Sequence, residues 1–264
     1  MIITLSTDSN YVKHALYLLK SIAINSPLVR VHCRAVDCTE SEIQLLQAAH
    51  PDAIIVNEQL NLSTKRQYFR AGTVLSTDLY KRGPHGAHLL SHRQCFVSNT
   101  RYRNILYCLE VLNEDVVILL DADAIVRKDL TQLIEFFKNY DVLCNVATDA
   151  DRYPRRRCWE CSCIVAVNNT RSIDFFKHVQ KMTEDSMTDW DSDQFAIENV
   201  YNLDQSAIHL CEDISHVEDL SWRDVTVENW NAISYNYNED NYIWPGSGEA
   251  KFTKPYLREQ NKYK

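Results

Sequence analysis

The sequence lacks the features that mark several common classes of protein. It has no apolar run as long as a membrane span. Its first residues, MIITLSTDSN, carry no basic stretch ahead of their short apolar run, so we expect no signal peptide. Acidic residues outnumber basic ones, 36 to 28, for a formal net charge of −8 at pH 7. That balance argues against a broadly basic surface for gripping nucleic acid.

Glycine is scarce, with five in 264 residues, whereas cysteine is frequent, with nine. The segment after the first apolar run, STDSNYVK, has no glycine, which excludes a nucleotidyltransferase with a Gly-rich phosphate loop. The segment CWECSC suggests a zinc site, but no second CxxC accompanies it, so we interpret its thiols as core or loop residues. Without an export signal we expect reduced cysteines and a cytoplasmic location.

The remaining composition, 45% hydrophobic and 24% charged, is that of an ordinary globular protein of one large domain, with or without a small appendage. Short apolar runs alternate with amphipathic stretches, which predicts an α/β fold with a mostly parallel, doubly wound sheet flanked by helices. The predicted strands are Ile2–Thr7, Val29–Asp37, Asp52–Asn57, Val116–Leu120, Asp141–Ala147, Cys163–Asn168 and Ala207–Leu210. The predicted helices are Asn10–Asn25, Thr39–His50, Ser91–Leu112, Leu130–Asn139, Ser172–Asp185 and Asp191–Tyr201.

We divide the chain into a main α/β domain, residues 1–205, and an aromatic-rich C-terminal extension, residues 206–264, that packs on it. The extension contains the Gly/Pro segment WPGSGEAKF. Its aromatic side chains either stack on a ligand at the rim of a binding site or form a small satellite core. They are Trp222, Trp230, Tyr235, Tyr237, Tyr242 and Trp244.

The most informative segment is EDVVILLDADAIVRKDL, in which an apolar strand ends on Asp121 and Asp123. Ligands of open parallel sheets bind beyond the carboxyl ends of the strands. Residues two apart on an extended chain lie on one face, so both carboxylates can point the same way. Two like charges at close range repel, and a divalent cation between them reverses that interaction. Hard oxygen ligands suit Mg²⁺ or Mn²⁺, which keep open positions for phosphate oxygens.

Three segments, in order, resemble nucleotide-sugar glycosyltransferases of the GT-A fold, in particular the glycogenin and galactosyltransferase-like group of family 8. They are IITLSTDSNYVKHALYLLKSI, then RYRNILYCLEVLNEDVVILLDADAIVRKDL, then CSCIVAVNNTRSIDFFKHV followed by DWDSDQFAIENV. The resemblance covers about residues 1–201. It implies a metal-dependent transfer of a sugar, a hexose or a pentose, from a nucleoside-diphosphate sugar to an acceptor hydroxyl.

By the same resemblance, Asp121 and Asp123 bind the metal, and Asp121 and Ala122 lie at the diphosphate and ribose. Asp193 and Gln194 face the reacting carbon of the sugar, and Asp191 or Asp193 is the base if the reaction inverts configuration. The other donor-binding residues implied are Thr7, Asp8, Tyr11, Arg101, Arg103 and Lys251.

The chain departs from the family pattern at two places. Cys161-Ser162 stands where a glycine is usual, and Trp244-Pro245 stands where a metal-binding histidine is expected. His209, His216 or water then completes the metal shell. The acceptor is a carbohydrate or another hydroxyl-bearing molecule. An anionic or nucleic-acid acceptor held by Arg155–Arg157 is not favoured.

Two other functions remain open at this point. One is a non-catalytic module that binds a nucleotide sugar without hydrolysing it. The other, less favoured, is a phosphatase whose first motif aspartate is the nucleophile; that class opens with its motif, whereas here the motif lies in mid-chain.

Overall fold

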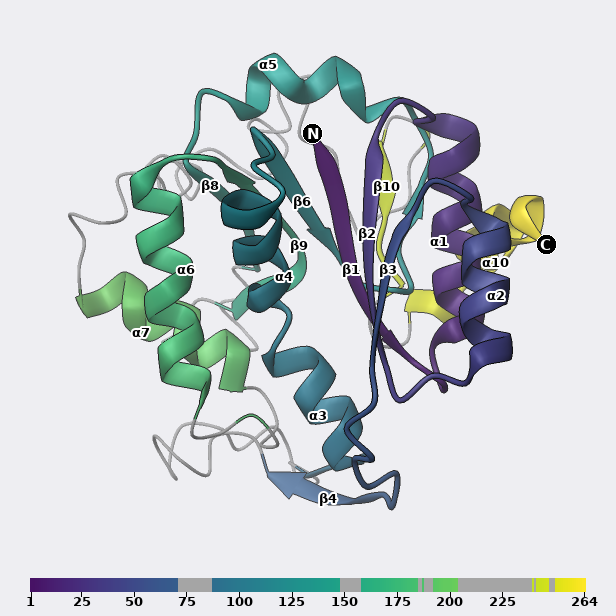
Figure 1. Cartoon of the computed structure of the whole chain (residues 1–264), viewed down its shortest axis with the longest axis horizontal. Coiled ribbons are helices and arrows are strands. Elements are labelled where there is room, and N and C mark those ends of the chain that lie inside the picture. The colour runs from purple at the N-terminus through teal and green to yellow at the C-terminus, as the bar shows by residue number, and fades with distance from the viewer. Residues whose placement is uncertain are drawn as a thin grey trace.

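Six strands form the central sheet of the computed structural model, in the order β3-β2-β1-β6-β9-β8 (Figure 1). The structure describes residues 1–70, 87–147, 158–184, 187, 192–203, 239, 241–246 and 250–264. The strands of the sheet are β1 (Ile2–Asp8), β2 (Arg30–Val36), β3 (Ile54–Glu58), β6 (Val116–Leu120), β8 (Val142–Ala147) and β9 (Cys158–Val167).

The sheet is mostly parallel, as the sequence predicts. β1 pairs in parallel with β2 on one side and with β6 on the other, and β2 pairs in parallel with β3. β9 is reversed and runs antiparallel to both β6 and β8. The apolar runs of β1 and β6 are buried, which is typical of strands covered on both faces.

Helices flank the sheet in two groups (Figure 1). α1 and α2 pack together beside β1 and β3, whereas α4, α6 and α7 cluster beside β6 and β9. The helices are α1 (Val12–Asn25), α2 (Glu40–Ala49), α3 (His92–Asn99), α4 (Tyr102–Leu106), α5 (Ile134–Phe137), α6 (Thr170–Thr183), α7 (Ser192–Leu203) and α10 (Lys254–Gln260).

The helix predicted over Ser91–Leu112 is broken in the structure. α3 ends just before Thr100, α4 begins two residues later, and a π-helical turn follows α4. The Thr100 hydroxyl donates to the carbonyl of Phe96 at 2.7 Å and accepts from Arg34 Nη1 at 2.6 Å. A threonine hydroxyl that bonds back to the preceding turn competes with the helix ladder. The break places Arg101 at the start of α4, where its side chain can leave the helix.

Smaller differences from the predicted elements occur elsewhere. The helix predicted over Leu130–Asn139 is a 3₁₀ turn, Leu130–Leu133, followed by the single turn of α5. β9 begins earlier than predicted, at Cys158. The strand predicted at Ala207–Leu210 lies outside the described residues.

The described C-terminal residues pack against the motif segment and against α1. β10 (Ile243–Trp244) pairs antiparallel with β7 (Ile125–Val126), which begins two residues after Asp123. Farther on, Asn25 Nδ2 at the end of α1 donates to the Tyr263 hydroxyl at 2.8 Å. Residues 205 and 206, where we place the domain boundary, are outside the described part, as are Trp222, Trp230, Tyr235 and Tyr237. The division into domains therefore stays a prediction.

A single large core joins the sheet to both groups of helices. It includes side chains from β1, β2, β6 and β9 and from α1, α4 and α6. Within the described ranges no helix combines the length and the apolar character needed to cross a bilayer.

Candidate active site

Acidic residues end neighbouring parallel strands along one edge of the sheet. Asp8 is the last residue of β1, Asp37 follows β2 directly, and Asp121 follows β6 directly. Because these strands are parallel neighbours, their carboxyl ends meet at the same edge. This is where open α/β sheets bind ligands.

Arg101 joins the first motif aspartate to α7. Its Nη1 lies 2.7 Å from Asp121 Oδ1, and its Nη2 lies 3.2 Å from Asp193 Oδ2. Nη1 also donates to the carbonyl of Cys161 at 2.8 Å. Burial lowers the pKa of Arg101, but the two carboxylates outweigh that effect, and the net pKa is raised. One half-buried cation therefore neutralises two acids that the sequence separates by 72 positions (193 − 121).

Lys251 pairs with the second motif aspartate. Its Nζ lies 2.8 Å from Asp123 Oδ2, 3.3 Å from the Tyr11 hydroxyl and 5.0 Å from the centre of the Tyr11 ring. Burial lowers the pKa of Lys251, but Asp123 more than compensates and the net pKa is raised. The structure thus brings together Tyr11 and Lys251, both predicted to bind the donor, and Asp123, predicted to bind the metal.

The C-terminal region also fixes the backbone of Asp123. The Tyr256 hydroxyl donates to the Asp123 carbonyl at 2.6 Å. Gly246 lies so close that a Cβ added to it would be 2.3 Å from the same carbonyl oxygen. Only glycine tolerates this approach of two backbones.

Each motif carboxylate contacts a different cation of the chain: Asp121 contacts Arg101, and Asp123 contacts Lys251. Among the residues that the structure describes, no three His, Cys, Asp or Glu side chains are grouped so as to hold a metal ion. The donor chemistry still fits Mg²⁺ or Mn²⁺, because these ions are commonly held by one or two carboxylates, with water and substrate phosphates as the other ligands. At the position of the expected histidine, Trp244 is buried, and the guanidinium carbon of Arg127 lies 3.9 Å from the centre of its ring. His209 and His216 are outside the described residues.

Asp8 lies at the predicted nucleotide end of the edge. Its Oδ1 accepts from the backbone N–H groups of Asn10 and Tyr11 at 3.1 and 3.2 Å, and its Oδ2 accepts from Asn10 Nδ2 at 3.2 Å. Burial raises the pKa of Asp8 despite these hydrogen bonds. Its neighbour Thr7 is buried and donates to the Asp8 carbonyl at 3.3 Å.

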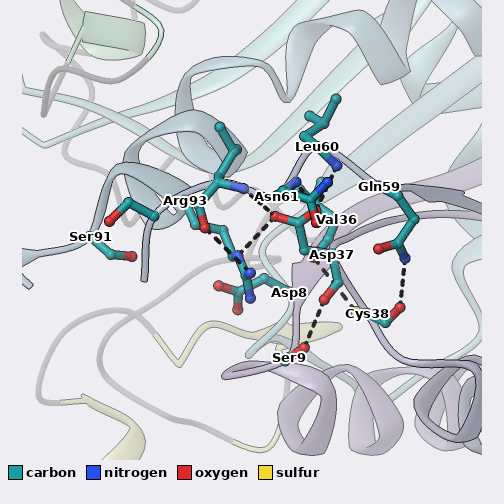
Figure 2. Close-up of polar contacts among 12 residues, drawn as sticks. Asp8, Ser9, Val36, Asp37, Cys38, Gln59, Leu60, Asn61, Ser91 and Arg93 are labelled. Carbon is teal, nitrogen blue, oxygen red and sulfur yellow. Dashed lines mark hydrogen bonds and ion pairs between the residues drawn. The ribbon is translucent and has the colours of Figure 1, made fainter. Parts of the chain in front are cut away.

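Asp37 is not among the predicted site residues, yet its carboxylate holds the loop beside Asp8 through hydrogen bonds (Figure 2). Its carboxylate accepts from the backbone N–H groups of Leu60, Asn61 and Leu62 at 2.6, 2.7 and 2.8 Å, and Arg93 Nε lies 3.2 Å away. Burial alone would raise the pKa of Asp37, but these contacts outweigh it and the net pKa is lowered. Its position at the end of a parallel strand, which it shares with Asp8, is the feature of the sequence that could have identified it.

The residues predicted to face the reacting carbon lie on α7. Asp193 is buried; it accepts from the Ser98 hydroxyl at 3.3 Å, and its backbone N–H donates to Asn99 Oδ1 at 3.2 Å. Gln194 Oε1 is buried without a hydrogen-bond partner in the described part of the chain. Asp191 is outside the described residues, so the alternative base is not placed.

The two candidate arginines before the motif strand separate in the structure. Arg101 lies at Asp121, whereas Arg103 Nη2 donates to the sulfur of Met187 at 3.1 Å. Ala122, between the motif aspartates, is buried.

Comparison with known proteins identifies the family and supports the fold. Residues 2–172 match the model of glycosyl transferase family 8. The glycosyltransferase GlyE of Streptococcus pneumoniae TIGR4 superposes with a TM-score of 0.52 and 11% identity, over 98% of this chain and 59% of that one. The bifunctional glycosyltransferase WbbM superposes with a TM-score of 0.51 and 13% identity, over 100% of this chain and 49% of that one. Curated proteins give no significant match to the sequence.

These findings confirm the predicted GT-A type of fold. The chain spans only part of the length of both structures, so their activities are not carried over from the superposition. The family match, in contrast, covers more than half of the chain. The protein therefore belongs to glycosyl transferase family 8 and is a glycosyltransferase.

Proposed function

We propose that the protein moves a sugar from a nucleoside-diphosphate sugar to an acceptor hydroxyl and needs Mn²⁺ or Mg²⁺ to do so. The observation that carries this proposal is the position of Asp121 and Asp123 at the carboxyl edge of the sheet, each beside a cation of the chain. A diphosphate at this edge would meet Arg101 and Lys251, and a divalent ion bound by the two aspartates would add further positive charge at its oxygens.

The nucleotide would extend from this point toward the end of β1. Tyr11 offers a ring, and Asp8 offers a carboxylate whose neighbours already orient it. Lys251 contacts both Tyr11 and Asp123, so it lies between the proposed base and diphosphate positions. A cation at that place can stabilise the charge that the diphosphate gains as it leaves.

The reaction breaks the bond between the anomeric carbon and a phosphate oxygen, and the electron pair stays on the diphosphate. The acceptor oxygen forms the new bond and loses its proton. Asp193 and Gln194 are the groups we place at the reacting carbon. Because Arg101 neutralises Asp193 and Asp121 together, the sugar and the diphosphate would be bound by parts of one connected network.

Family membership does not favour the phosphatase alternative, and no described feature favours a module that only binds. The basic segment Arg155–Arg157 is outside the described residues, so an anionic acceptor has no structural support. The acceptor is proposed as a carbohydrate or another hydroxyl-bearing molecule.

The test is a thermal-shift panel with UDP, GDP, ADP and their glucose and galactose conjugates, each with and without Mn²⁺. A bound ligand raises the melting temperature by mass action, in proportion to RT ln(1 + [L]/Kd). We expect the compounds of one nucleotide base to raise the melting temperature, and to raise it more with Mn²⁺ than without it. We also expect slow hydrolysis of the sugar conjugate that stabilises the protein. Stabilisation that is identical with and without the metal would contradict the metal requirement.

A further inference from the structure

One arginine, Arg34 on β2, is buried inside the fold instead of lying at its surface. Its side chain is 4% exposed. Within the described ranges its polar contacts are with two residues: Nη1 donates to the Thr100 hydroxyl at 2.6 Å and to the Thr100 carbonyl at 3.3 Å, and Nη2 donates to Glu58 Oε2 at 2.6 Å. Buried ion pairs are often replaceable by apolar side chains of similar volume without loss of stability, so stability alone does not account for this arginine.

Arg34 ties the end of α3 to the sheet. Its two hydrogen bonds to Thr100 act on the residue that follows α3, and its guanidinium carbon lies 5.4 Å from the centre of the Phe96 ring, one turn earlier. The beginning of α3 is tied to the same strand, since Arg93 Nε lies 3.2 Å from the carboxylate of Asp37, the residue after β2 (Figure 2). β2 therefore holds both ends of this helix.

The end of α3 in turn positions Arg101. The Arg101 Nε donates to the Ser98 carbonyl at 2.7 Å, and Nη2 donates to the Ser98 hydroxyl. The same guanidinium contacts Asp121, at the motif, and Asp193, on α7. Because Arg101 directly follows Thr100, a shift of Thr100 moves the backbone from which this side chain extends. A misplacement of about 1 Å can lower a reaction rate about 10²-fold, even when the mutation is far from the chemistry.

We propose that Arg34 is a positioning residue for the transfer reaction: through Thr100 it places the Arg101 guanidinium between the two carboxylates. The inference rests on the proposed function, because the position of Arg101 matters to turnover only if a sugar nucleotide binds at Asp121. Arg34 itself lies two strands from the motif strand and, in the described part of the chain, has no polar contact with a residue placed at the donor.

The experiment is a double-mutant cycle between Arg34→Met and Arg101→Ala in the full-length protein. Methionine is long and apolar, so it fills the position without the charge. Single-turnover hydrolysis of the sugar conjugate that stabilises the wild-type protein, with Mn²⁺, gives the rate of each variant. We expect Arg34→Met to be about tenfold slower than wild type. When Arg101 is already alanine, the same change should alter the rate less than about twofold, because the group that Arg34 positions is then absent.

Arg30→Met is the matched control. Arg30 is on the same strand and is also ion-paired, with Glu114, but it is the first residue of β2 and its side chain is 54% exposed. This variant should keep the wild-type rate within about twofold, the range of ordinary surface changes.

Thr100→Val and Thr100→Ser test the same connection from the other partner. Valine has the shape of threonine without its hydroxyl, whereas serine keeps the hydroxyl that accepts from Arg34. We expect the valine variant to be slowed and the serine variant to stay within about twofold of wild type. This pair decides the question if Arg34→Met does not fold, which its melting temperature would show.

A wild-type rate in Arg34→Met, equal slowing by it with and without the Arg101 side chain, or equal rates for the two Thr100 variants would each overturn the inference. Each of these results would leave the proposed function intact. A wild-type protein that hydrolyses none of the sugar conjugates would instead contradict the proposed function, and the role of Arg34 with it.

Discussion

Asp37 and Asp123 are both aspartates near strand ends at one edge of the sheet, yet their carboxylates are satisfied in different ways. Asp37 accepts from three backbone N–H groups and contacts Arg93. Asp123 contacts the side chain of Lys251. Backbone donors move only if the loop moves, whereas a lysine side chain can exchange its partner for a phosphate. The first arrangement holds the scaffold, and the second leaves a carboxylate available to a ligand.

The largest expected effect concerns the motif aspartates, which are the kind available to a ligand. Asp121→Asn combined with Asp123→Asn should abolish Mn²⁺-dependent nucleotide binding and turnover. Loss of one electrostatic contact costs about 10²–10³ in rate, and here two are lost. Single-turnover donor hydrolysis and nucleotide titration measure the effect. Wild-type activity in the double variant would refute the assignment of the site.

Next in size is the matched pair of arginines before the motif strand. Arg101→Ala removes the cation between Asp121 and Asp193, so we expect kcat/KM to fall about 10²-fold. Arg103→Ala is the control, because Arg103 contacts the sulfur of Met187 and should retain kcat/KM within about twofold, the range of ordinary surface changes. Equal losses in both variants would mean that Arg101 has no special place in the site.

A third pair tests the scaffold itself. Asp37→Asn should lower the free energy of unfolding by about 2–3 kcal/mol, because hydrogen bonds to a charged group are lost. Asp8→Asn should not lower it at neutral pH, since burial raises the pKa of Asp8 and its charge therefore opposes folding there. It should instead weaken nucleotide binding. Urea denaturation measures the free energy of unfolding, and nucleotide titration measures binding. A loss of stability in Asp8→Asn together with weakened nucleotide binding in Asp37→Asn would overturn the comparison.

The smallest effect is a dependence on pH. The folded-state pKa of Asp37 is lowered, so its contribution to stability is fully present above its ordinary pKa of about 3.9 and is lost as pH falls through the folded value. The difference in unfolding free energy between wild type and Asp37→Asn should be constant near neutrality and shrink below about pH 4. A difference that grows on acidification would show that Asp37 is not stabilised as an anion.

Much of this architecture is predictable from local pattern. The apolar runs of β1 and β6 and the amphipathic periodicity of α1 specify their own elements, and the resemblance places Asp121, Asp123 and Asp193 in one site. The partners of the aspartates are not predictable in this way. Lys251 follows Asp123 by 128 positions (251 − 123). The break before Arg101 depends on a buried arginine from β2 that bonds to Thr100.

The cytoplasmic location and the domain boundary after residue 205 remain predictions. Seven cysteines whose side chains the structure describes are buried and form no disulfide, and those near the site contact polar neighbours such as the Tyr102 hydroxyl, 3.2 Å from Cys161.

The packing of residues 243–246 and 250–263 on the motif segment and on α1 has a consequence for synthesis on the ribosome. The strand that carries Asp121 and Asp123 leaves the exit tunnel long before Gly246, Lys251 and Tyr256 are translated. Until those residues arrive, Asp123 has neither its cation nor the hydroxyl that holds its carbonyl. A nascent or prematurely terminated chain that lacks these residues cannot form the contacts of Asp123 with Lys251 and Tyr256, so we expect unfinished copies to be inactive.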